Sequence, residues 1–254
     1  MPKPAPSLII LDEVDSTNNY AMARVHEGLT KHGDTYFTHA QTNGKGQRGK
    51  SWQTGKGQNI ALSIVLEPEG LQVAQQFRLS VAVSLACFDF FSKYAGDETK
   101  IKWPNDIYWR DRKAGGILIE NVIGKNDNSK ATKGKWKYAI AGIGININQT
   151  DFDKALANPV SLKQITGKEF STEKLARELQ QFVLDKMNEL SIISFDKVLK
   201  QYNSCLYKHN QPVKLRKGNI VFETTIKGVT ENGKLYTQDV IDNYFDFGEV
   251  DWLL

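Results

Sequence analysis

The sequence predicts an α+β protein in which a mixed or antiparallel sheet packs against helices, followed by a small C-terminal β unit. Two apolar stretches, 115–123 and 137–148, flank a polar insert, which is typical of an antiparallel hairpin. Residues 73–94 repeat apolar side chains at intervals of three and four, as a packed helix does. From residue 211 onward, short apolar stretches separated by glycines indicate a small antiparallel barrel.

The other elements follow from local patterns along the chain. Capping residues at 15–18 open a helix that ends at Gly28, and amphipathic periodicity indicates two later helices. We place a domain boundary near Tyr207, which divides the chain into residues 1–206 and 207–254, and we expect the polar insert at 124–135 to be exposed and mobile. The expected strands are 8–11, 36–40, 60–66, 101–103, 107–109, 212–218, 221–229, 234–238 and 244–254, and the later helices are 172–190 and 194–203.

Composition excludes several functional classes. The chain has 254 residues, of which 40% are hydrophobic and 24% charged, an ordinary globular balance. The net charge of +4 is mild, so it favours anionic ligands without indicating DNA or a membrane surface. Cys87 and Cys205 are far apart and form no C-x-x-C pair, which indicates reduced thiols. No apolar run suits a signal peptide or a membrane helix, and we expect a soluble, cytoplasmic protein.

The stretch QTNGKGQRGKSW at 41–52 contains the G-x-G-x-x-G spacing of a dinucleotide-binding turn. A Rossmann fold requires a helix directly after these glycines, whereas here a strand is expected at 60–66, so that interpretation fails. Glycines that expose backbone N–H groups, alternating with Lys and Arg, favour an anion-binding loop. A flexible solvated loop and a loop for single-stranded nucleic acid remain open alternatives.

Three further polar motifs have both a structural and a ligand-binding interpretation. In KWPND at 102–106, the proline predicts a turn that presents Asn105 and Asp106 at the end of a strand. Lys113 enters an apolar strand, where it either reaches solvent or meets a negative charge on a ligand. The residues DSTN either cap a helix or bind a carboxylate or ureido group. The four histidines are scattered singly and support no histidine-based mechanism.

Taken together and in order, these motifs resemble those of a biotin–protein ligase. The resemblance covers nearly the whole chain and is carried by DSTN at 15–18, QTNGKGQRGKSW at 41–52, KWPND at 102–106, RKAGGILIE at 112–120, GIGININ at 142–148 and GEV at 248–250. It implies a catalytic domain like that of class II aminoacyl-tRNA synthetases over 1–206 and an SH3-like β domain over 207–254. The chain starts at the catalytic domain, so it resembles the monofunctional type without a winged-helix DNA-binding domain, and we expect no DNA partner.

The resemblance also implies a two-step reaction. Biotin and ATP, with Mg²⁺, would form biotinyl-5′-AMP, and a lysine of a biotin carboxyl carrier protein or domain would then accept the biotin. The enzyme would be a monomer or a homodimer, and the strand at 142–147 is a candidate edge for pairing of two copies. The alternatives are a lipoate–protein ligase-like acyl-adenylate transferase and a non-catalytic regulator that binds biotinyl-AMP.

Roles for individual residues follow from the resemblance. Lys113 and Lys45 would be catalytic, Asp106 would bind Mg²⁺, and Trp52 would cover the adenine. The family often has G-R-G-R where this chain has Gly44-Lys45-Gly46-Gln47, so loop closure is where the chain departs from the pattern. The implied biotin contacts are Ser16, Thr17, Asn18, Gln41, Lys45, Gly46, Gln47, Lys113, Gly115 and Gly116, and the implied nucleotide contacts are Trp52, Lys102, Asn105 and Asn146.

Overall fold

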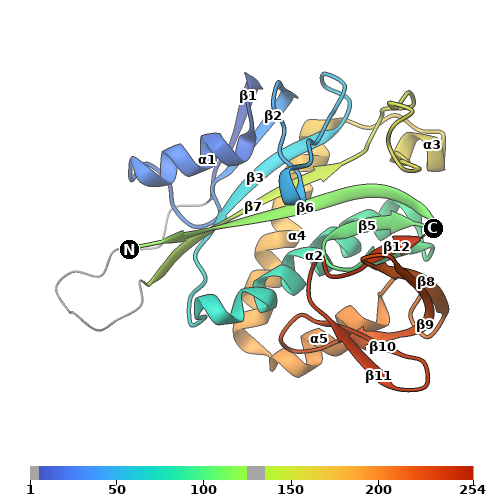
Figure 1. Cartoon of the computed structure of the whole chain (residues 1–254). Coiled ribbons are helices and arrows are strands. Elements are labelled where there is room, and N and C mark those ends of the chain that lie inside the picture. Colours follow the sequence, from blue (N-terminus) through green and yellow to red (C-terminus); the bar gives the residue numbers. More distant parts are fainter. Residues whose placement is uncertain (1–5, 125–134, 254) are drawn as a thin grey trace.

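A computed structural model of the chain describes residues 6–124 and 135–253 and contains two sheets (Figure 1). The predicted insert at 124–135 lies, apart from its two end residues, outside the described residues. The first sheet is mixed, as predicted, because β1 and β2 are parallel whereas all other neighbours in it are antiparallel. Its strands, in spatial order, are β1 (Leu8–Val14), β2 (Thr35–Gln41), β3 (Ile60–Leu66), β7 (Trp136–Ile145), β6 (Arg112–Ile123), β5 (Asp106–Trp109) and β4 (Thr99–Lys102).

Helices cover both faces of this sheet (Figure 1). Because successive side chains of a strand point to opposite faces, Tyr36 packs with α1 (Thr17–His26), whereas the adjacent Phe37 belongs to the larger core on the other side. That larger core contains α2 (Gln76–Ala95), α4 (Thr172–Ile192) and α5 (Phe195–Ser204). The four longer helices expected from periodicity and capping are therefore confirmed.

The strand at 142–147 is not an edge, and the prediction that it pairs two copies is wrong. Strand β7 pairs with β3 on one side and with β6 on the other, so its backbone groups are already used within the sheet. The edges of this sheet are β1 and β4. A strand that is buried on both faces has a near-continuous apolar sequence, and this is the physical reason for its small and apolar residues.

The C-terminal β unit is a second, antiparallel sheet. Its strands, in spatial order, are β11 (Asp242–Phe245), β10 (Leu235–Gln238), β9 (Ile220–Val229), β8 (Pro212–Lys217) and β12 (Asp251–Leu253). The stretch expected as one strand at 244–254 is split by a turn in which Gly248 adopts φ +82°. Buried side chains of this sheet, among them Leu215 and Ile226, join the core of the first sheet. The proposed boundary near Tyr207 falls just before β8, in a segment whose Tyr207 N–H donates to Ile101 O.

One short helix was not predicted from the sequence. Helix α3 (Leu162–Thr166) is capped by Ser161, whose hydroxyl accepts a hydrogen bond from Gln164 N, while the Gln164 side chain accepts one from Ser161 N. Five residues are too few to show helical periodicity. Among the described residues, no helix has the length and apolar character needed to cross a membrane. Cys87 and Cys205 are not joined by a disulfide.

Candidate active site

A cavity of about 870 Å³ is lined by both sheets and by the glycine-rich loop between β2 and β3. Pockets for small molecules typically measure about 300–1,000 Å³. Gly115 does not line this cavity, because a side chain there would face Gly144 O and Ile145 inside the sheet. The structure brings all the other residues with implied roles to the lining: Ser16, Thr17, Asn18, Gln41, Lys45, Gly46, Gln47, Trp52, Lys102, Asn105, Asp106, Lys113, Gly116 and Asn146.

The start of α1 forms one polar wall of the cavity. Ser16 occupies the N-cap position, but its side chain makes no capping hydrogen bond. Thr17 instead donates from both its backbone N and its Oγ1 to Gln41 Oε1, over 2.9 and 3.1 Å. Ser16 and Thr17 are almost fully buried at 2% and 4% exposure. Because the Ser16 hydroxyl makes no capping hydrogen bond, it is available to a ligand in the cavity.

Asn18 continues this wall through partners that the sequence analysis did not identify. Its Oδ1 accepts from Ser63 Oγ at 2.5 Å, and its Nδ2 donates to Glu120 Oε2 at 2.7 Å. The amide also occupies the space that a side chain at position 142 would fill, so Gly142 is required for this packing. Alternation along β6 is the signal for Glu120, because it shares a strand face with Gly116 and Leu118, which line the cavity.

The glycine-rich loop is folded upon itself. Gly46 N donates to Lys50 O over 2.7 Å and Trp52 N donates to Gly44 O over 2.8 Å, which makes a tight hairpin with a single 3₁₀ turn at its tip. Gln47 Nε2 donates to Ile117 O over 3.2 Å and so ties the tip to β6. The chain then continues into β3, and the strand–loop–strand order that argued against a Rossmann fold is confirmed.

Trp52 packs against the first sheet inside the cavity. Its ring lies directly on Gly144, where any side chain would collide with it. A Cβ at Gly116 would lie 3.5 Å from the same ring. The ring lies 6.0 Å from Lys113 Nζ, and its Nε1 makes no hydrogen bond within residues 6–124 and 135–253. An unpaired buried indole N–H is a group that a bound ligand is able to satisfy. Contact of Trp52 with adenine stays a prediction.

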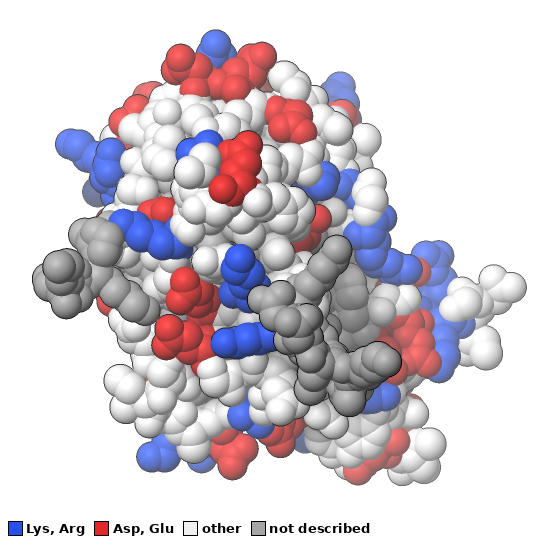
Figure 2. Space-filling model, turned by 90° about the vertical axis from the view of Figure 1, so that its left-hand side faces the viewer, with Lys and Arg blue, Asp and Glu red and all other residues white. Residues whose placement is uncertain are grey.

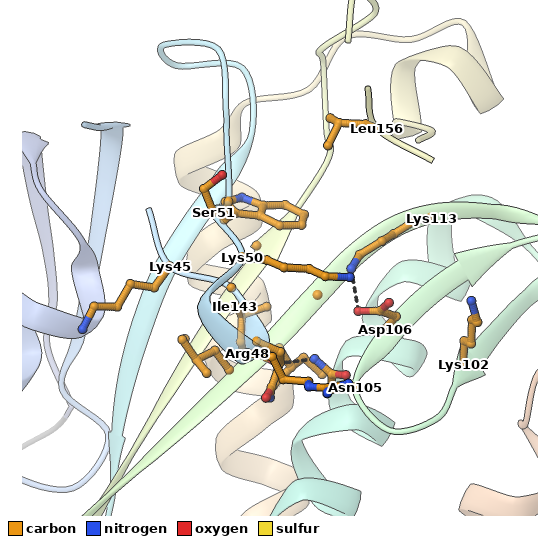
Figure 3. A pocket seen from close by; sticks show the side chains of 18 of the residues that line it. Lys45, Arg48, Lys50, Ser51, Lys102, Asn105, Asp106, Lys113, Ile143 and Leu156 are labelled. Carbon is orange, nitrogen blue, oxygen red and sulfur yellow. Dashed lines mark hydrogen bonds and ion pairs between the residues drawn. The ribbon is translucent and has the colours of Figure 1, made fainter. Parts of the chain in front are cut away.

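Cationic side chains gather around Asp106 (Figure 3). Lys113 Nζ lies 2.7 Å from Asp106 Oδ1, and the Lys50 side chain extends from the loop toward the same pair. Lys102 donates to Tyr108 OH over 3.1 Å. Burial lowers the pKa of Lys102 to about 8, with Asp106 opposing the shift and Lys113 and Lys50 adding to it.

The Lys45 side chain does not point toward the place where its implied catalytic role requires it. Figure 3 shows its side chain pointing away from Lys113 and Asp106, and its Nζ lies 3.8 Å from Glu120 Oε1. Lys50, which is not among the implied site residues, is the loop cation directed toward Asp106. The signal for Lys50 was present in the alternation of glycine and cation, which marks all three basic residues of the loop equally.

Two asparagines brace the backbone around Lys113. Asn105 Nδ2 donates to Ile117 O over 2.7 Å, and Asn146 Nδ2 donates to Val160 O over 3.2 Å. Val160 N in turn donates to Lys113 O over 2.8 Å. Both asparagines line the cavity, and contact with a nucleotide stays a prediction for each.

A metal site made by protein side chains alone is not present in the described part of the chain, which has no group of three His, Cys, Asp or Glu residues placed for one. Asp106 and Asp251 are the carboxylates of the cavity lining, and each is paired with a cation, Asp106 with Lys113 at 2.7 Å and Asp251 with Arg216 at 3.0 Å. Mg²⁺ is commonly held by one or two carboxylates together with phosphates and water. Asp106 fits that arrangement as a single protein ligand.

Surface charge gives no support to nucleic-acid binding on the face in Figure 2, where Lys and Arg side chains are intermixed with Asp and Glu. A nucleic-acid surface typically has a continuous basic stripe with exposed aromatic side chains. The hydrogen-bonded geometry of the loop speaks against a flexible solvated loop.

Comparisons with known proteins agree with this geometry. The model of the Biotin/lipoate A/B protein ligase family matches residues 10–132. The Bifunctional ligase/repressor BirA of Escherichia coli is 32% identical over 152 residues, which are 60% of this chain and 44% of BirA, so the match spans less than half the length of that relative. The Biotin--[acetyl-CoA-carboxylase] ligase of Paracoccus denitrificans is 26% identical over 89% of this chain and 92% of its own. A biotin protein ligase from Aquifex aeolicus, solved with biotin and ATP, has the same fold, with a TM-score of 0.78, 24% identity, and coverage of 97% of this chain and 98% of its own.

Proposed function

Because the model of the Biotin/lipoate A/B protein ligase family matches residues 10–132, we propose that the chain is a biotin–protein ligase. It activates biotin with ATP to biotinyl-5′-AMP and transfers the biotin to a lysine of a biotin carboxyl carrier protein or domain. The observation that carries this proposal is the division of one cavity into a buried polar wall at Ser16, Thr17 and Asn18 and a cationic cluster around Lys113. The wall suits a ureido head group, and the cluster suits a carboxylate and a phosphate.

The first step is attack of the biotin carboxylate on the α-phosphate of ATP, with pyrophosphate leaving. Two anions must approach each other, so catalysis requires fixed positive charge where negative charge develops. Lys113 supplies it, and Asp106 fixes the position of its ammonium group at 2.7 Å. Lys50 extends toward the same centre from the loop and contributes further positive charge.

In the second step the amine of the carrier lysine attacks the acyl carbon of the mixed anhydride, and AMP leaves. This step requires no nucleophile from the enzyme. The role of the chain is to hold the adenylate and to exclude water, which otherwise hydrolyses it. The tip of the glycine-rich loop, tied to Ile117 by Gln47, performs that function in this proposal.

Asp106 would provide one carboxylate ligand to Mg²⁺, and the phosphates of ATP and water would provide the remaining ligands. When bound, the cation neutralises charge on the phosphates. We further propose a synthetase-like catalytic domain over 1–206 and an SH3-like domain over 207–254. In the catalytic domain, biotin contacts Ser16, Gln41, Lys45, Gly46 and Gln47. The protein is cytoplasmic and is a monomer or a homodimer.

The competing function is that of a lipoate–protein ligase, because the matched family contains lipoate ligases as well as biotin ligases. ATP–pyrophosphate exchange with purified protein distinguishes the two. We expect exchange that depends on biotin and not on lipoate, and the reverse dependence would overturn the proposal. Transfer of labelled biotin to a carrier-domain lysine, lost in a carrier whose acceptor is Arg, excludes a non-catalytic regulator.

A further inference from the structure

The tip of the glycine-rich loop contacts the turn between β11 and β12, about 200 residues away in the sequence. The guanidinium Cζ of Arg48 lies 5.9 Å from the centroid of the Phe247 ring. Gly248 leaves the room for this approach, because a Cβ there would lie 2.8 Å from the same Cζ. Arg48 itself has φ 56°, a left-handed backbone that residues with a side chain rarely adopt. Such a conformation persists where surrounding contacts hold it.

The turn that receives Arg48 is held in place by its own contacts. The Phe247 ring packs edge-to-face against Trp103, with centroids 6.2 Å apart, and Trp103 Nε1 donates to Gly233 O over 3.0 Å. Asp246 N donates to the Glu249 carboxylate over 2.9 Å, and Glu249 N donates to Asp246 O over 3.0 Å. The turn is therefore a preformed surface, and the loop tip is the part that docks on it.

Both partners of this contact line the cavity. Arg48, Phe247 and Gly248 therefore lie at the border where the loop from the first sheet meets the second sheet. The hairpin of the loop is fixed to β6 through Gln47. Arg48 adds a second attachment, to a different sheet, so two adjacent residues of the tip hold the loop to both sheets.

We infer that Arg48 is a positioning residue, which holds the glycine-rich loop closed by packing on Phe247 in the space left by Gly248. The C-terminal sheet thereby controls how long an acyl-adenylate stays in the cavity. This second statement rests on the proposed function, whereas the docking of the loop does not. A cation over an aromatic face is attracted by about 0.5–1 kcal/mol at exposed sites such as this one, which corresponds to a roughly two- to fivefold change in an equilibrium.

Docking is tested without reference to activity by trypsin cleavage after Lys50 in the unliganded protein, followed by mass spectrometry. We expect Phe247→Ala and Gly248→Ala to accelerate this cleavage about two- to fivefold, because the loop opens more often. Tyr244→Ala is the matched control, since Tyr244 is exposed on β11 of the same sheet but does not line the cavity. Cleavage at the wild-type rate in both variants, with unchanged thermal unfolding, overturns the inference.

Retention of the adenylate is tested by forming it from biotin and ATP and trapping the released molecules with a free amine. Arg48→Ala and Phe247→Ala should each release adenylate about two- to fivefold faster, and the double variant no faster than either. Arg48→Lys, which keeps the cation, should recover part of the loss. Additive effects or wild-type release contradict the inference. If the wild-type protein forms no adenylate, the proposed function fails while the cleavage experiment still decides the docking.

Discussion

Lys113 Nζ lies 2.7 Å from Asp106 Oδ1, and the two residues come from the neighbouring strands β5 and β6. The pair lies at the edge of the cavity with the side chain of Lys113 about one-third exposed, at 34%. An ion pair in that position contributes little to stability. Its effect is positional, because the carboxylate fixes the direction in which Lys113 presents its charge to a ligand.

Replacement of Lys113 is therefore expected to affect catalysis far more than stability. Lys113→Ala should lower biotin-dependent pyrophosphate exchange by about 10²–10³-fold, because it removes charge stabilisation from the transition state. Lys163→Ala is the control, since Lys163 is an exposed lysine outside the cavity. A Lys113→Ala exchange rate close to the wild-type rate would remove Lys113 from the mechanism.

A second expectation concerns the close packing of Asn18 on Gly142. Gly142→Ala places a methyl group in the space of the Asn18 amide, so Asn18 must move away from Glu120. Loss of a buried hydrogen bond costs about 1–3 kcal/mol, and the KM for biotin should rise about ten- to hundredfold. Gly124→Ala is the control, because its nearest neighbour lies at an ordinary 3.6 Å. Equal KM values for the two variants would show that Asn18 does not contribute to biotin binding.

The strands of the first sheet were predictable where burial alone decides the pattern. β3 is apolar throughout and its predicted bounds, 60–66, agree with the observed ones. Periodicity reports which faces are buried, but it does not report which strand lies beside which. The parallel pairing of β1 with β2 and the interior place of β7 depend on contacts between distant segments, so local patterns could not reveal them.

The same limit applies to the site. Its motif residues were found because glycines, cations and prolines have local signatures, whereas Glu120 was missed although it binds Asn18, 102 residues away. The direction of a long side chain is also not a local property. Lys45 and Lys50 have the same chemistry and lie in one loop, yet only the folded structure shows that Lys45 lies near Glu120 while Lys50 extends toward Asp106.

The lowered pKa of Lys102 leads to a third expectation, for stability. Below pH 8 Lys102 is charged in both the folded and the unfolded state, so the folded state bears the cost of burying the charge. Lys102→Met removes that cost and should raise the free energy of unfolding at pH 7 by about 1–2 kcal/mol, after allowance for solvent screening. Phosphate binding should weaken in the same variant.

The sign of the pH dependence provides the check. Between pH 8 and 10.5 the unfolded state binds more protons than the folded state, so the stability of the wild-type protein rises with pH. The advantage of Lys102→Met should therefore shrink over that interval in urea unfolding experiments. Lys100→Met is the control for loss of a lysine side chain from the same strand. A constant advantage from pH 7 to 10 would show that packing, and not charge burial, is responsible.

Glu120 allows the roles of a hydrogen-bond acceptor and of a charge to be separated. Lys45 is 40% exposed and 3.8 Å away, so its pairing with Glu120 is worth little, whereas the hydrogen bond from the buried Asn18 is short at 2.7 Å. Glu120→Gln keeps an acceptor and should change the Kd for biotin less than about twofold. Glu120→Leu removes the acceptor and should weaken binding about tenfold with kcat nearly unchanged. Titration calorimetry with biotin measures the Kd of both variants. Glu169→Leu, which removes an exposed carboxylate elsewhere, is the control. If Glu120→Gln binds as weakly as Glu120→Leu, the charge facing Lys45 decides biotin binding and the acceptor does not.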